Sequence, residues 1–138
     1  IVGAGGGFKQ TLVDSGIAGI IAAWIQQAAV PALLAGWLVA VAVRLATGSA
    51  TVATITAAGI MAPLASHMPQ TGVALLVLAI GAGSVFLSHV NDAGFWLVKE
   101  YFGMTVGQTF KTWSLMETIL SVVAMATISL LALALGVF

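Results

Sequence analysis

The chain has 138 residues, of which 61% are hydrophobic and only 6% charged, and its formal net charge is zero. Soluble domains carry about 25% charged residues, so this composition excludes an ordinary soluble domain and predicts an integral membrane protein. The apolar runs lack the strict alternation of barrel strands, which favours an all-α fold. Zero net charge gives no reason to expect nucleic acid as a partner. The absence of cysteine excludes disulfides and thiolate chemistry.

Residues 1–30 begin with a glycine-rich stretch and continue into an apolar run over 17–25. Glycine disfavours a regular helix, and Gly5, Gly6 and Gly7 follow one another directly. The apolar run is too short to cross a hydrocarbon core of ~30 Å. We therefore predict a re-entrant hairpin leg over 1–30 with the glycines at its tip; a glycine-rich loop before a surface helix is the alternative. The first residues do not resemble a signal peptide, so we expect the segment to begin inside a longer protein.

Residues 31–66 are predicted to form one interrupted transmembrane helix. Pro31 suits a helix start, because its missing N–H costs least there. The apolar flanks 31–45 and 52–66 are each too short to span the core alone at ~1.5 Å per residue. Between them Gly48 has the freedom to break a helix. The hydroxyls around this break, which can satisfy freed backbone groups or a ligand, belong to Thr47, Ser49, Thr51 and Thr54.

Residues 72–96 are predicted to form a second span with a polar stripe at its far end. On a continuous helix Ser84, Ser88 and Asp92 lie at i, i+4 and i+8, and His89 lies three residues before Asp92. A carboxylate at the bilayer centre costs ~2.5–3.5 kcal/mol on insertion scales, so these groups indicate a partner, a cavity or a proton path. The alternative is that they cap a helix at the membrane edge.

Residues 113–138 are predicted to form the last span, after a short polar connection over 99–112 in which Gly107 is one of the helix breakers. Glu117 is the only charged residue of this span. We expect the span to face lipid or to serve packing alone. The orientation of the spans stays open, because the lysines of the chain are too few to decide it.

Several strings occur together in an order and spacing that match one transporter family. They are GAGGGFKQ at 3–10, DSG at 14–16, RLATGSATVA at 44–53, SHVNDAGFW at 88–96, KEYFG at 99–103, KTW at 111–113 and MET at 116–118. Over essentially the whole chain, they closely resemble the C-terminal part of the gluconate permease family of proton symporters. A set of strings is more specific than a single glycine motif.

The resemblance implies a multi-pass carrier that takes up gluconate or a related sugar acid with protons through the bacterial inner membrane. A full-length member of the family is much longer, so we expect that an N-terminal half is missing here. The family is placed with ion transporters built from two inverted repeats, each with a re-entrant hairpin and a broken helix. This chain would supply one repeat's hairpin leg, its broken helix and the spans after it. A homo-oligomer is left open.

The residue pattern and the resemblance indicate the same candidate site. Half-helix N-termini carry partial positive charge and free N–H donors, which suits a carboxylate at the helix break and at the hairpin tip. The predicted substrate-binding residues are Gly5, Gly6, Gly7, Thr47, Gly48, Ser49, Thr51 and Arg44. Arg44 is either the counter-ion of the acid, or it snorkels to the interface or pairs with Asp92 or Asp14. For proton coupling we predict Asp92 first and His89 second, since an imidazole can relay a proton to a buried carboxylate.

Other functions explain less of the sequence. An intramembrane enzyme with His89 and Asp92 as acid and base lacks a nucleophile across a cleft, so we expect no enzyme. Two distant histidines without an HExxH pattern make a poor metal site, and we predict no metal and no cofactor. An assembly subunit would use the small-residue faces 57–59 and 81–83 but leaves the charged helix break unexplained. A sodium-coupled carboxylate carrier is the runner-up, because hydroxyls and freed carbonyls can ligate Na⁺.

Overall fold

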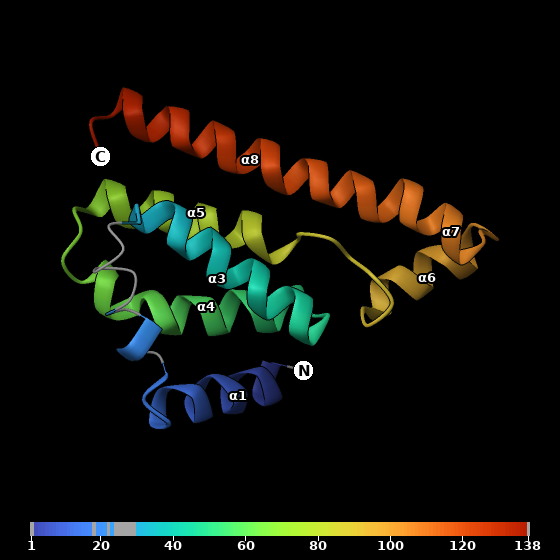
Figure 1. Cartoon of the computed structure of the whole chain (residues 1–138), viewed down its shortest axis with the longest axis horizontal. Coiled ribbons are helices and arrows are strands. Elements are labelled where there is room, and N and C mark those ends of the chain that lie inside the picture. Colours follow the sequence, from blue (N-terminus) through green and yellow to red (C-terminus); the bar gives the residue numbers. More distant parts are fainter. Residues whose placement is uncertain (1, 18, 22, 24–29, 138) are drawn as a thin grey trace.

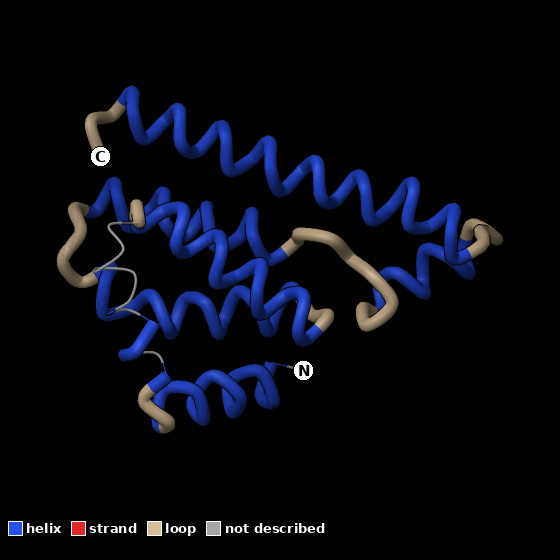
Figure 2. The backbone as a smooth tube through the Cα atoms, in the orientation of Figure 1, coloured by secondary structure: helices blue, strands red, loops and turns tan. Residues whose placement is uncertain are grey.

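The computed structural model describes residues 2–17, 19–21, 23 and 30–137. Within these residues every regular element is a helix, as expected of an all-α protein (Figure 1, Figure 2). The last helix runs along the length of the molecule and brings the chain back to the end at which α3 begins (Figure 1). Shorter helices pack on one side of it.

α3 (Ala32–Thr47) and α4 (Ala50–Ala65) form a helical hairpin that turns at Gly48. The two helices pack side by side instead of end to end (Figure 1), which corrects the predicted single interrupted helix over 31–66. The chain reverses because Gly48 has a φ of 67°, in the left-handed region, and Ser49 is extended. The Ser49 hydroxyl then accepts a hydrogen bond from Val52 N at 3.3 Å and caps α4. Residues 47–49 are called the hairpin tip below.

A second break separates α5 (Gln70–Ser84) from α6 (Ala93–Tyr101). Residues 85–92, called the α5–α6 connection below, are not helical. The predicted continuous span over 72–96 is therefore wrong beyond the end of α5. The cause is local, because Asp92 caps α6 by accepting a hydrogen bond from Gly94 N at 2.8 Å, and Leu87 has a positive φ of 43°.

The last helix consists of three consecutive pieces, which are α7 (Val106–Thr109), a π-helical turn η1 (Phe110–Ser114) and α8 (Leu115–Ala134). Together they make the 29-residue run Val106–Ala134, the one helix in the described part of the chain that is long and apolar enough to cross a membrane. It extends about 43 Å at 1.5 Å per residue. The predicted span over 113–138 starts too late, because a capping box of Thr105 and Gln108 begins the helix and Gly107 lies inside it.

α1 (Val2–Asp14) is a regular helix that packs against α4. The prediction that Gly5, Gly6 and Gly7 form a non-helical hairpin tip is wrong, because these glycines lie within α1. Packing against another helix offsets the ~1 kcal/mol that a glycine costs in a helix. α1 ends before Gly16, whose φ is 77°. Residues 18, 22 and 24–29 of the predicted hairpin leg lie outside the described residues.

Close packing brings α8 against α3 and α5. The backbones of α3 and α5 approach so closely that a Cβ on Gly83 would lie 2.4 Å from Trp37 O. Trp37 Nε1 donates to Ser121 Oγ at 3.1 Å, and Ser121 Oγ donates to Ala82 O at 2.6 Å. These bonds connect α3, α8 and α5, and they fix which face of α8 is turned inward. Glu117 lies on the same face, one turn before Ser121.

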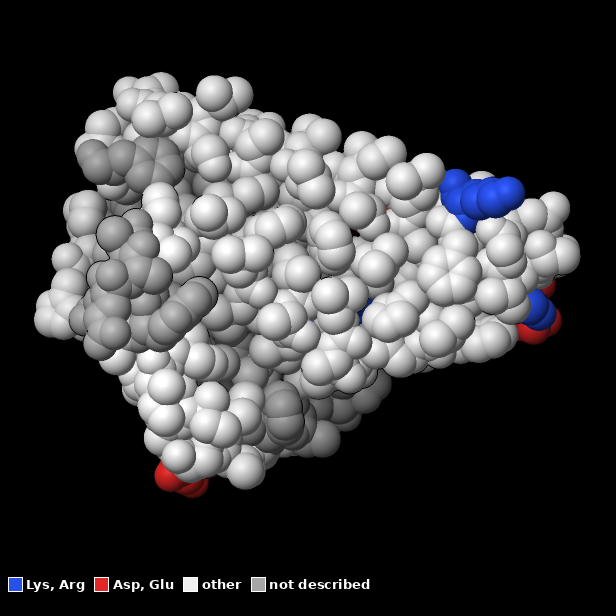
Figure 3. All heavy atoms as spheres, in the orientation of Figure 1, with Lys and Arg blue, Asp and Glu red and all other residues white. Residues whose placement is uncertain are grey.

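The outer surface of the molecule is largely apolar. Figure 3 shows a face on which the charged atoms lie mostly at the end near α6 and α7 and at the opposite end near α1. On α8, Leu120, Leu130 and Leu133 point outward and are 59%, 67% and 64% exposed. Large exposed apolar surfaces of this kind fit a lipid environment.

Candidate functional site

A pocket of about 600 Å³ opens where the hairpin tip, the α5–α6 connection and the start of the last long helix meet. Three charged side chains from three different elements line it, namely Arg44, Asp92 and Glu117. The other lining residues are Thr47, Gly48, Ser49, Ala50, Thr51, Val52, Asn91, Ala93, Gly94 and Trp113. Because charge is costly to bury in an apolar protein, this cluster is the candidate site.

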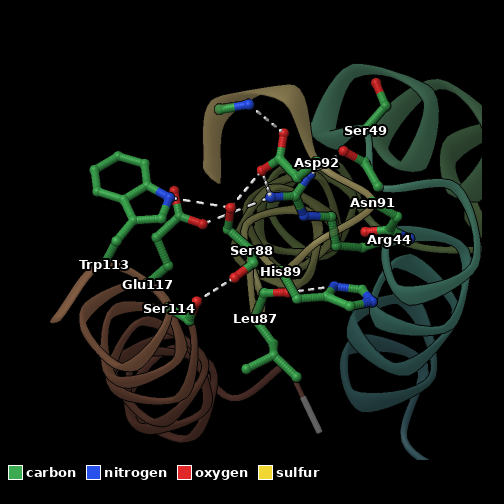
Figure 4. A network of polar contacts seen from close by, with 12 residues as sticks. Arg44, Ser49, Leu87, Ser88, His89, Asn91, Asp92, Trp113, Ser114 and Glu117 are labelled. Carbon is green, nitrogen blue, oxygen red and sulfur yellow. Dashed lines mark hydrogen bonds and ion pairs between the residues drawn. The ribbon is translucent and has the colours of Figure 1, made fainter. Parts of the chain in front are cut away.

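Arg44 lies at the centre of the cluster (Figure 4). It comes from the last turn of α3, and its side chain is 4% exposed. Nη1 donates to Gly48 O at 2.7 Å, and Nη2 donates to Asp92 Oδ2 at 2.6 Å. The guanidinium therefore holds the hairpin tip against the α5–α6 connection. Its Nε is buried and has no hydrogen-bond partner among the described residues, which leaves one N–H donor unused.

Asp92 is surrounded by donors. Its Oδ2 accepts from Arg44 and from Ser88 Oγ, and its Oδ1 accepts from Gly94 N at 2.8 Å. Trp113 Nε1 donates to Ser88 Oγ at 3.0 Å, so η1 is connected to the same carboxylate through one hydroxyl. Both carboxylate oxygens are engaged. Of the partners considered for Arg44 from the sequence, Asp92 is the one that the structure contains.

Glu117 reaches the same guanidinium from α8. Its Oε2 lies 3.6 Å from Arg44 Nη2, which is close enough for an ion pair but too far for a hydrogen bond. Its side chain is 15% exposed, and Oε2 is buried without a hydrogen-bond partner in the part of the chain that the structure describes. The prediction that the span over 113–138 faces lipid or serves packing alone is therefore wrong at Glu117. The spacing of Ser114, Glu117 and Ser121 at i, i+3 and i+7 is the signal of a shared inward face.

The hairpin tip and the start of α4 present backbone donors and hydroxyls to the pocket. The first three residues of α4 line the pocket. Ser49 caps Val52 N, and the N–H groups before it lack a partner within the helix and lie at its partly positive end. Thr47 Oγ1 donates to Val43 O at 2.8 Å, and Thr51 lies in the first turn of α4. A carboxylate in the pocket would therefore meet both a guanidinium and a helix N-terminus.

The structure brings the residues predicted at the helix break together and leaves the other predicted residues outside the pocket. Those that line it with Asp92 are Arg44, Thr47, Gly48, Ser49 and Thr51. Those that belong to α1, away from the lining, are Gly5, Gly6 and Gly7. His89 also lies outside, with its ring turned away from Asp92 and Nδ1 3.1 Å from Leu87 O (Figure 4). The shared stripe of His89 and Asp92 required a continuous helix, which this segment does not form.

Asn91 and Trp113 are pocket residues that sequence reasoning missed, in addition to Glu117. Asn91 Nδ2 donates to Leu45 O at 2.9 Å and ties the α5–α6 connection to the end of α3. The hairpin tip rests on the same residue, because a Cβ on Gly48 would lie 2.2 Å from Asn91 O. Asn and Asp before a helix are a cap signal, which could have located this break.

The chain is similar to known permeases over almost its whole length. The family profile described as GntP family permease matches residues 1–134. The chain is 60% identical over 135 residues to a gluconate permease of Pseudomonas aeruginosa and 55% identical over 124 residues to a high-affinity gluconate transporter of Escherichia coli K12. It is 50% identical over 125 residues to the Gnt-II system L-idonate transporter of the same strain.

These matches cover most of this chain but a minor part of each relative. They include 98%, 88% and 91% of this chain and 30%, 28% and 28% of the three relatives. The chain therefore spans about 30% of the length of these relatives. No solved structure matches it significantly.

Proposed function

Because the chain belongs to the GntP permease family, we propose that it forms the substrate-binding part of a carrier for gluconate or a related sugar acid. Relatives that match nearly the whole chain are named gluconate permease and L-idonate transporter. Both names refer to sugar acids, which present a carboxylate and several hydroxyls. The observation that carries the proposal is a buried arginine with one N–H donor that no described residue accepts, in a pocket that also holds a helix N-terminus.

In this proposal the substrate carboxylate binds between Arg44 and the start of α4. Arg44 Nε, which has no partner among the described residues, supplies one donor. The N–H groups of α4 that precede the capped Val52 supply further donors at a partly positive helix end. The hydroxyls of the sugar chain bind to Thr47, Ser49 and Thr51, which line the same pocket. Hydroxyl groups both donate and accept, so these side chains match the substrate's own hydroxyls.

The helix lengths support a re-entrant hairpin at α3 and α4 in place of one at residues 1–30. Each of these helices has 16 residues, and at 1.5 Å per residue each is about 24 Å long, shorter than a hydrocarbon core of ~30 Å. The hairpin tip then lies within the membrane, where non-helical backbone needs a protein-lined cavity. α5, the α5–α6 connection and α6 form the broken helix of the same unit. Broken helices whose ends face a binding site are typical of secondary transporters.

The length of the relatives supports a larger carrier around this chain. The chain spans about 30% of the length of the Pseudomonas relative. We propose that a further segment of the same polypeptide closes the open side of the pocket. We also propose that the whole carrier crosses the bacterial inner membrane several times.

For energy coupling we propose protons, and sodium is the alternative. Asp92 has three donors around its carboxylate, so we assign it to holding Arg44 in place. A proton on Asp92 would remove an acceptor from these bonds. His89 lies outside the pocket and receives no step in the proposal. We therefore propose that another member of the cluster binds the proton.

Uptake of radiolabelled gluconate into vesicles tests the proposed function. The vesicles contain the full-length carrier, meaning the complete polypeptide in which this chain occurs, and either a pH gradient or a sodium gradient is imposed. We expect accumulation under the pH gradient and competition by other sugar acids. Arg44→Lys should weaken substrate binding at least about tenfold, because lysine lacks the fork of donors.

The matched control is the reverse exchange at an exposed site outside the pocket, Lys111→Arg, which should transport normally. Accumulation under the sodium gradient alone would favour the alternative coupling ion. No accumulation under either gradient, in vesicles with correctly inserted carrier, would contradict the proposal.

A further inference from the structure

We propose that Glu117 binds the co-transported proton, and that its charged form competes with the substrate carboxylate for Arg44. The inference rests on the proposed function, since it identifies the coupling group of that carrier. Its basis is a buried carboxylate oxygen without a hydrogen-bond partner among the described residues, 3.6 Å from Arg44 Nη2. In the same pocket Arg44 Nε is a buried donor that is also unused.

The two carboxylates of the cluster differ in how they are held. Asp92 accepts hydrogen bonds from Arg44, Ser88 and Gly94, so a proton on Asp92 would disturb bonds that hold two elements together. Glu117 Oε2 makes none of these bonds. A proton can therefore bind to Glu117 and leave it again without breaking the contact between the hairpin tip and the α5–α6 connection.

The charges of the cluster predict that one proton accompanies one substrate anion. Arg44, Asp92 and Glu117 carry one positive and two negative charges when both acids are ionised, which leaves one net negative charge. A sugar-acid anion entering this state would add a second negative charge inside a partly buried pocket. When Glu117 has bound a proton, the cluster is neutral, and the anion restores the single negative charge.

The same geometry provides a route for release. The charged groups that face Glu117 within the described residues are Arg44 on α3 and Asp92 in the α5–α6 connection. Asp92 carries the same charge as Glu117, so an ionised Glu117 has Arg44 as its counter-ion within the described residues. Loss of the proton from Glu117 therefore draws the guanidinium toward α8 and away from the substrate carboxylate. The atoms need to move little, because the ion-pair distance is already 3.6 Å.

The variant Glu117→Gln in the full-length carrier tests this inference, because glutamine keeps the size of the side chain and fixes it in an uncharged form. Gluconate affinity is measured against pH in detergent. In the wild type we expect Kd to rise about tenfold per pH unit above the pH at which Glu117 loses its proton. In Glu117→Gln we expect Kd to vary by less than about twofold over the same range.

Transport by the same variant gives a second readout. We expect Glu117→Gln to exchange external for internal gluconate without a gradient, but to lose accumulation driven by a pH gradient at least about tenfold. Glu100→Gln is the matched control, because Glu100 is 72% exposed and its ion-pair partner is the neighbouring Lys99. The control should behave like the wild type in both measurements.

A wild-type pH slope or wild-type accumulation in Glu117→Gln overturns the inference and leaves the proposed function intact. Absence of gluconate binding to the wild type at any pH overturns both. If Glu117→Gln does not reach the membrane, the inference is tested by measuring proton uptake by the wild-type carrier. Gluconate is added to the wild-type carrier in a weakly buffered solution with a pH indicator, at a pH above the one at which the Kd of the wild type begins to rise. Uptake of about one proton per bound gluconate supports the inference, and no uptake overturns it.

Discussion

Replacing Gly48 with alanine tests whether the hairpin tip rests on the α5–α6 connection. Gly48 has a φ of 67°, and the left-handed conformation costs an L-residue about 1–2 kcal/mol. The new Cβ would also lie 2.2 Å from Asn91 O and 2.6 Å from the Asn91 carbonyl carbon. These are backbone atoms that cannot rotate away, and overpacking of this kind costs typically ~1–3 kcal/mol. The two effects together should destabilise the carrier by about 2–5 kcal/mol.

Thermal unfolding of the full-length carrier in detergent measures this loss, and gluconate affinity is measured alongside it. Gly107→Ala is the matched control, because Gly107 lies in a helix with open space at its Cβ position. The Gly107→Ala exchange should stabilise the folded carrier by ~0.5–1 kcal/mol. Gly48→Ala should lower the melting temperature and weaken gluconate binding, since Gly48 O accepts a hydrogen bond from Arg44. Equal melting temperatures and affinities in the two variants would refute the contact between tip and connection.

Two further substitutions test the contacts that place the charged cluster. Asp92→Asn takes the negative partner from a buried guanidinium, which can cost up to ~3–5 kcal/mol of stability. We expect a lower melting temperature and no gluconate uptake. An unchanged melting temperature would contradict the pairing of Arg44 with Asp92. Ser121→Ala removes the donor to Ala82 O and should cost ~1–3 kcal/mol in thermal unfolding. The control is Thr127→Ala at an exposed position, whose free energy of unfolding should stay within about 0.5 kcal/mol of the wild type. Similar melting temperatures for Ser121→Ala and Thr127→Ala would argue against the bond from Ser121 to Ala82 O.

The fold class and the position of the first break could be predicted from local features. Long apolar runs with few charges have one common solution in a membrane, which is helices. Gly48, with hydroxyl residues on both sides, indicated where the first helix ends. The direction of the chain after Gly48 could not be predicted, because a glycine break allows both continuation and reversal. Contacts of α3 and α4 with other helices decide between the two.

The second break had a local cap signal at Asn91 and Asp92, but a competing helical spacing indicated continuation, and the distant contact that holds the break could not be predicted. Ser84, Ser88 and Asp92 have a spacing that fits one face of a continuous helix. In the structure Asp92 instead caps α6 and binds Arg44, which lies 48 positions earlier in the chain. The wrong prediction of a non-helical tip in α1 also comes from a contact between distant residues. Glycine propensity is a local quantity, whereas the packing of α1 against α4 is not.

The charged cluster also bears on the idea that this chain serves assembly alone. The chain has four Lys or Arg and four Asp or Glu residues, and three of these eight line one pocket. Replacing a buried ion pair by apolar residues of similar size is often neutral or stabilising, so stability is a poor reason for keeping Arg44, Asp92 and Glu117 together. A pure assembly subunit would hold its helices more simply through small-residue faces. The proposed binding of an anion together with a proton gives the three charges a reason to remain side by side.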